Sequence, residues 1–155
     1  MSWFWKAWKV RSPEGVTLGL RLPRSWKRVR DAAATLAFRN ERDGSLFQIT
    51  PYPREVSGSM RGKLREAVAA RAKEIAPQSV DDHIELYGIG GENVDGWYFI
   101  ATDRNVKPSE WAHMISGMIE IDRQVMTFTI LSHQRPRMGE GDALRAFNYL
   151  RVRNA

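Results

Sequence analysis

Cysteine is absent from the 155 residues of this chain. Its absence excludes disulfides, thiolate nucleophiles and the usual cysteine-based structural zinc sites. It does not fix the compartment, because cytosolic and periplasmic proteins can both lack cysteine. Residues 1–5 contain no apolar run of signal-peptide length, so we expect a cytoplasmic protein as the sequence is written, and a periplasmic one if a signal peptide was removed.

Long apolar runs and internal repeats are also missing. No segment approaches the roughly 20 consecutive apolar residues that span a bilayer, and no self-similar period is found. Hydrophobic residues make up 43% and charged residues 27% of the chain, which excludes an intrinsically disordered or fibrous protein. A chain of this length buries a sizeable core, so we predict a single α+β domain over residues 14–155, preceded by a basic aromatic segment over residues 1–13.

Positive charge is unevenly distributed along the chain. The formal net charge is +6, and residues 1–31 carry eight basic side chains against Glu14 and Asp31. The remainder is neutral, with 16 basic and 16 acidic residues. Such asymmetry indicates either an anionic partner, whether nucleic acid, acidic protein or lipid headgroups, or a basic face that is merely solvated.

Four large aromatic residues stand among basic ones in the first twelve positions. Aromatic rings beside cations suit a membrane interface, and they equally suit stacking on single-stranded nucleic acid. An edge strand or terminal helix that docks its rings on the domain gives the same pattern, and we favour it because four exposed large aromatics would promote aggregation. The candidate interaction surface combines aromatic anchors with basic steering residues: Trp3, Trp5, Trp8, Lys6, Lys9, Lys27 and Arg28.

Apolar and polar residues alternate through most of the chain at the period of two that is typical of half-buried strands. Strands are predicted over residues 16–22, 36–39, 46–50, 84–90, 96–103, 111–121 and 124–132. Only Asp122 and Arg123 separate the last two, and so short a link requires antiparallel neighbours. The glycine-rich residues 88–93 precede a strand rather than a helix, so we interpret them as a hairpin or bulge and not as a phosphate-binding loop.

Two segments show helical spacing instead. Apolar residues recur at helical intervals over residues 59–76, with Ser57 or Ser59 as the expected cap and Pro77 beyond the end. A second amphipathic helix is predicted to close the chain over residues 141–152. The predicted fold is therefore α+β: an antiparallel sheet of about six to seven strands with two main helices packed on it.

Residues capable of catalysis are present by type but not in a reaction-specific pattern. The chain has no Gly-x-Ser-x-Gly nucleophile motif, and its three histidines do not have metal-ligand spacing. His83 follows two aspartates in what we interpret as a solvated connection, and His113 shares a strand face with Ile115, as a partly buried, hydrogen-bonded histidine does. We predict no enzymatic activity, no metal and no cofactor; an enzyme with a histidine–carboxylate site is the least favoured alternative.

The order of the segments resembles that of a known fold. Residues 15–23 form an apolar strand that ends in proline, with Trp26 shortly after, and residues 126–131 form a late "apolar-Thr-Phe-Thr" strand that leads to the closing helix. This arrangement resembles the PsbP-like fold, an α/β/α sandwich shared by photosystem extrinsic subunits, Ran-binding Mog proteins and bacterial DcrB-type proteins. The resemblance implies a central antiparallel sheet and a bacterial-type accessory protein without intrinsic catalysis.

The expected function is thus a non-catalytic interaction or accessory module that binds a protein partner through an exposed sheet face or loop. The alternative is a peripheral binder of anionic membrane or nucleic acid through the basic aromatic N-terminal region, with affinity that falls steeply as salt is added. A homo-oligomer formed through an exposed edge strand is also left open.

Overall fold

The computed structural model describes residues 5–11, 16–29, 35–91, 93–108, 110–135, 147 and 151–154. In chain order the elements are β1 (Trp5–Arg11), β2 (Val16–Pro23), β3 (Trp26–Val29), β4 (Leu36–Asn40), β5 (Leu46–Pro51), α1 (Arg54–Met60), α2 (Leu64–Ile75), the 3-10 helix η1 (Ala76–Gln78), β6 (Tyr87–Gly90), β7 (Val94–Thr102), β8 (His113–Ile121), β9 (Gln124–Ser132) and β10 (Arg151–Asn154). No helix among these residues is long and apolar enough to cross a membrane.

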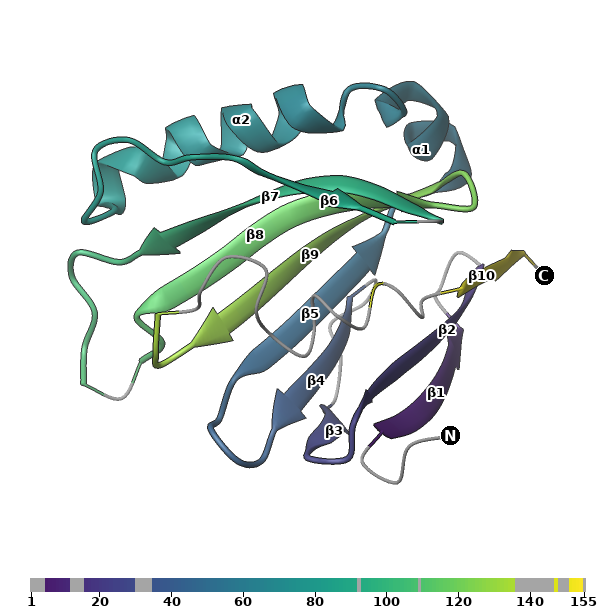
Figure 1. The fold of residues 1–155 in the computed structure, drawn as a ribbon, viewed down its shortest axis with the longest axis horizontal. Helices are drawn as coiled ribbons and strands as arrows, with labels where there is room; N and C mark the ends of the chain where they lie inside the picture. The colour runs from purple at the N-terminus through teal and green to yellow at the C-terminus, as the bar shows by residue number, and fades with distance from the viewer. Residues whose placement is uncertain are drawn as a thin grey trace.

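Most of the strands belong to one large antiparallel sheet. Within the described residues it has seven strands in the order β3-β4-β5-β9-β8-β7-β6 (Figure 1). The first three strands follow one another directly, as do the last four in reverse order, and the pairing of β5 with β9 joins the two groups. Together with α1 and α2, this sheet confirms the predicted α+β fold and its six to seven strands.

The turn between β8 and β9 confirms the predicted two-residue hairpin. Asp122 and Arg123 both have positive φ angles, 51° and 68°. Positive φ at both central residues is the type I′ conformation, whose twist matches that of the flanking strands. The nine-residue register from His113↔Ser132 to Ile121↔Gln124 follows from this turn.

Alternation along the strands divides the buried side chains between the two faces of the sheet. On β7, β8 and β9 the face under the helices carries Phe99, Met118 and Val125, which pack with Val68 of α2. The opposite face carries the other core, to which β2 and β4 also contribute and whose largest fully buried rings are Phe38, Phe47 and Phe128.

Two helices, and not one, cover the first of these faces. α1 contacts β9, and α2 lies across β7 and β8 (Figure 1). The predicted helix over residues 59–76 is therefore wrong at its start, because Gly62 adopts a φ of +78° and ends the first helix. α2 begins at Leu64. Neither predicted serine caps it, since Ser57 and Ser59 belong to α1.

Ser57 fastens α1 to the start of β9. Its Oγ accepts hydrogen bonds from the Val125 amide at 3.2 Å and from Gln124 Nε2 at 3.0 Å. Gln124 Nε2 also donates to the Tyr52 carbonyl at 2.7 Å. Ser57 and Gln124 are both buried, so these contacts satisfy polar groups that have no access to water.

A second sheet, made of β1, β2 and β10 in the order β1-β2-β10, packs against the core face opposite the helices. The leucines at positions 18, 20 and 22 of β2 enter that core.

The predicted closing helix over residues 141–152 is wrong at its end, where Arg151 and Val152 pair with β2 as a strand. Most of that segment lies outside the described residues; Phe147 is buried and packs edge-on against Phe128, with ring centroids 4.7 Å apart.

Candidate functional site

The small sheet concentrates the positive charge of the chain. β1, β2 and β10 together carry six basic residues and no acidic residue. Their combined formal charge therefore equals the +6 of the whole chain. The backbone register aligns basic positions of the two outer strands across β2, in the rows Lys9–Gly19–Arg151 and Arg11–Thr17–Arg153.

Strand alternation decides which side chains of this sheet face away from the core. Trp8 pairs with the buried Leu20, so even-numbered positions of β1 face inward. Lys9 of β1 and Arg21 of β2 both lie on the outer side, and both are exposed. Trp5 is half-buried and lies on the same side. We call this outer side of β1 and β2, with the aligned positions of β10, the basic face.

The spacing of the basic face follows from strand geometry. Alternate residues along a strand lie about 7 Å apart and neighbouring strands about 4.8 Å apart. The two rows of basic positions therefore occupy a patch of roughly 7 by 10 Å. Among the described residues Asp122 reaches this sheet, its Oδ2 accepting a hydrogen bond from the Val152 amide at 3.3 Å. The strands themselves carry basic residues and no acidic one, and such an excess of positive charge raises the association rate of an anionic partner.

The structure divides the predicted interaction residues among different surfaces. Trp8 contacts Phe38 edge to face, with ring centroids 5.3 Å apart, and so attaches β1 to the core. The Lys6 ammonium lies 4.2 Å from the centroid of the Trp8 ring, an arrangement favoured by cation–π attraction. Trp5 and Lys9 remain on the outer side. β1 is therefore the docked edge strand predicted for the N-terminal aromatics, and Trp8 is the ring that packs on the core.

Two further predicted residues lie away from the basic face. Lys27 and Arg28 are exposed on β3, the edge strand of the large sheet, and as neighbours in a strand they point to opposite sides. Trp3 lies outside the described residues. Sequence reasoning missed Arg151, which falls within the predicted closing helix, and Arg153, which lies just beyond it. Arg21 had a usable signal in its alternation with Leu20 and Leu22.

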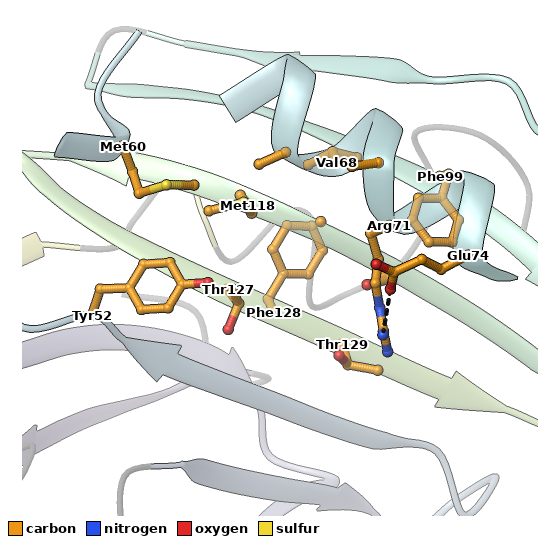
Figure 2. Close-up of a pocket in the computed structure, with 14 residues that line it drawn as sticks. Tyr52, Met60, Val68, Arg71, Glu74, Phe99, Met118, Thr127, Phe128 and Thr129 are labelled. Atoms are coloured by element: carbon orange, nitrogen blue, oxygen red, sulfur yellow. Dashed lines mark ion pairs between the residues drawn. The ribbon is translucent and has the colours of Figure 1, made fainter. Parts of the chain in front are cut away.

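A cleft of about 400 Å³ opens between α2 and the large sheet (Figure 2). Its floor is formed by β8 and β9, including Met118, Thr127 and Thr129. Tyr52 and Met60 lie at one end, and Arg71 and Glu74 lie at the other (Figure 2). We call this hollow the α2 cleft.

The histidines are placed separately from one another. His113 is half-buried, and its Nδ1 lies 2.9 Å from Thr102 Oγ1, which confirms the predicted hydrogen-bonded histidine. Burial, followed by the positive charge of Arg135, lowers the pKa of His113. Arg135 stands between the imidazole and the carboxylate of Asp81, since it hydrogen-bonds both Thr102 and Asp81. The arrangement stabilises a neutral imidazole rather than a histidine–carboxylate pair.

The remaining histidines lie at the surface. His83 is exposed in a hollow beside α2 that also includes Asp82 and Glu85. His133 is exposed and stacks on Trp111, whose indole N–H donates to the Gly44 carbonyl at 2.9 Å. Within the described part of the chain, no three histidine, aspartate or glutamate side chains are grouped so that they could hold a metal ion.

Comparison with known proteins gives a fold and no function. No family model matches the chain, and no curated protein matches it. The structure is similar to a crystal structure from Bacteroides thetaiotaomicron VPI-5482, with a TM-score of 0.51 and 18% sequence identity. The match covers 94% of this chain and 48% of that one, so this chain spans about half the length of its structural neighbour. The PsbP-like resemblance is not tested by these comparisons and stays a prediction.

Proposed function

We propose that the protein is a non-catalytic binding module that docks an acidic partner protein through the basic face. The observation that carries this proposal is the separation of charge: three adjacent strands carry six basic residues and no acidic residue, and the exposed Lys9 and Arg21 among them point away from the core. Arginine and tryptophan are the residues that most often dominate binding energy at protein interfaces. Trp5, on the same side as Lys9, supplies an aromatic contact beside the charges.

A protein partner suits this face better than nucleic acid does. Sheets that bind single strands present two or three aromatic rings on which bases stack. Among the described residues of the basic face Trp5 is the one aromatic side chain, and it lies at the edge of the sheet opposite Pro23. The basic face also presents no helix that could enter the major groove of DNA.

A membrane surface is likewise the weaker alternative. Peripheral membrane binding combines basic residues with apolar side chains that enter the acyl region. Trp8, which the sequence offered for that role, is instead packed against Phe38 in the core. The outward positions of β1 and β2 are mostly basic or small, including Ala7 and Gly19.

Charge reversal on the basic face tests the proposal. The double variant K9E/R21E is compared with K63E/K73E, which makes the same change of charge at the two ends of α2. Binding of poly-L-glutamate, a dT20 oligonucleotide and phosphatidylglycerol vesicles is measured by titration at low and high salt. We expect poly-L-glutamate to bind the natural chain most tightly, and K9E/R21E to weaken it about tenfold, since two charge contacts of roughly 0.7 kcal/mol each are lost.

The control variant separates the effect of where the charges lie from the effect of the net charge on binding. K63E/K73E is expected to retain poly-L-glutamate affinity within about twofold. Equal losses in the two double variants would show a non-specific charge effect and remove the basic face as the site. Tighter binding of dT20 or of the vesicles, lost in K9E/R21E, would replace the acidic protein by nucleic acid or by membrane.

A further inference from the structure

The α2 cleft is built from small residues on one wall and apolar residues on the floor. Ala67 and Ala70 of α2 line it, and their short side chains leave room beside the helix. Met60, Val68 and Met118 supply its apolar surface. Methionine side chains adapt readily to the shape of a bound molecule. A volume of about 400 Å³ lies within the range of small-molecule sites.

Four hydroxyl groups line the same cleft. The side chains of Ser116, Thr127, Thr129 and Tyr52 make no hydrogen bond to any other described residue. Ser116 is 9% exposed and the other three side chains are half-buried, so these hydroxyls keep contact with solvent. Each hydroxyl can donate one hydrogen bond and accept others. A ligand bound in the cleft would take the place of water as the hydrogen-bond partner of these hydroxyls.

Charge at the cleft is balanced. Arg71 and Glu74 lie together at the end away from Tyr52, with Arg71 Nη1 3.7 Å from Glu74 Oε2 (Figure 2). They are the two charged residues among those that line the cleft, and their charges are opposite. The lining therefore gives no net attraction to an anion or to a cation, which favours an uncharged ligand.

We propose that the α2 cleft binds a small, uncharged, amphipathic molecule, an apolar skeleton that bears hydroxyl or carbonyl groups. The skeleton packs against Met60 and Met118, and its oxygen atoms exchange hydrogen bonds with Thr127 and Thr129. This site lies on the helix-covered face of the large sheet, whereas the basic face belongs to the other sheet. Its ligand is therefore independent of the proposed protein partner.

Prodan, an uncharged naphthalene that carries a ketone and a tertiary amine, is a suitable fluorescent probe. The full chain is titrated with prodan, and the shift of its emission to shorter wavelength is followed. A70F fills the mouth of the cleft from an exposed position, and A69F places the same ring one residue earlier on α2, where it lines a different hollow. T127V/T129V removes two hydroxyls with little change of shape. Thermal unfolding confirms that each variant is folded.

The proposal predicts saturable binding of one prodan per chain. A70F weakens it at least about tenfold and A69F changes it less than about twofold, while T127V/T129V weakens it about three- to tenfold through lost hydrogen bonds. Absence of saturable binding, or equal weakening by A69F and A70F, overturns the site. Tighter binding of the sulfonate 1-anilinonaphthalene-8-sulfonate than of prodan overturns the uncharged class of ligand.

Discussion

Gly117, in the centre of β8, is a position at which one added methyl group should strongly destabilise the fold. A Cβ atom there would lie 2.4 Å from the Trp97 carbonyl oxygen, 2.7 Å from Tyr98 Cβ and 2.8 Å from Phe128 Cε1. Carbon atoms in contact prefer separations of about 3.5–4.0 Å, so β7 or β9 must move by several tenths of an ångström or more. Overpacking of this kind costs about 1–3 kcal/mol. We expect the cost of G117A to lie near the upper end of this range, because the Trp97 backbone and the buried Phe128 ring both occupy the space that the methyl group needs.

A smaller effect opposes this loss. Alanine restricts the unfolded chain more than glycine does, which stabilises the folded state by about 0.4–1 kcal/mol where the site accepts it. The net expected loss for G117A is about 2 kcal/mol. Urea unfolding followed by tryptophan fluorescence measures it, and the transition should move to lower urea concentration without a change of slope.

Gly88 provides the matched control within the same sheet. A Cβ at Gly88 on the edge strand β6 meets its nearest neighbour, the Trp97 ring, at 3.8 Å, which is ordinary contact. G88A should therefore be neutral or stabilise the fold by up to about 1 kcal/mol. If G117A proved no less stable than G88A, the close packing of β7, β8 and β9 around position 117 would be refuted.

Three further changes test other parts of the fold. S57A should cost about 1–3 kcal/mol in urea unfolding, because the buried Val125 amide loses its acceptor; a loss below 0.5 kcal/mol would contradict that contact. R123G should raise stability by about 0.5–1 kcal/mol, since Arg123 holds a φ of 68° that glycine adopts without strain; a destabilised variant would argue against the type I′ turn. The lowered pKa of His113 favours its neutral form in the folded state. Its stabilising contribution is present above the ordinary pKa of 6.5 and is lost as the pH falls below that value. The unfolding free energy of the natural chain should consequently decline more between pH 7.5 and pH 5.5 than that of H113Q, and equal declines would refute the assignment.

The strands of the large sheet were largely predictable from the sequence because period-two alternation is a strong local signal. The helix boundary was not. Residues 59–63 continue the helical spacing of α2, yet the positive φ of Gly62 separates two helices. Glycine is tolerated inside helices, so the sequence alone does not show that the backbone turns there.

The division of the N-terminal tryptophans also required the structure. Residues three positions apart, such as Trp5 and Trp8, share a face of a helix but lie on opposite faces of a strand. As the sequence left both an edge strand and a terminal helix open, it did not show which ring faces the core. Arg151 and Arg153 were missed for a related reason: the strand that carries them has four residues, too few for a reliable period.

The most direct test of the basic face as a docking site is to map poly-L-glutamate binding by nuclear magnetic resonance. Backbone amide shifts of the nitrogen-15-labelled full chain are recorded during the titration. The account predicts that the largest changes occur in β1 and β2, at Ala7, Lys9, Gly19 and Arg21, and that they disappear at high salt. Changes concentrated instead on α2 or β6, with β1 and β2 unaffected, would contradict it.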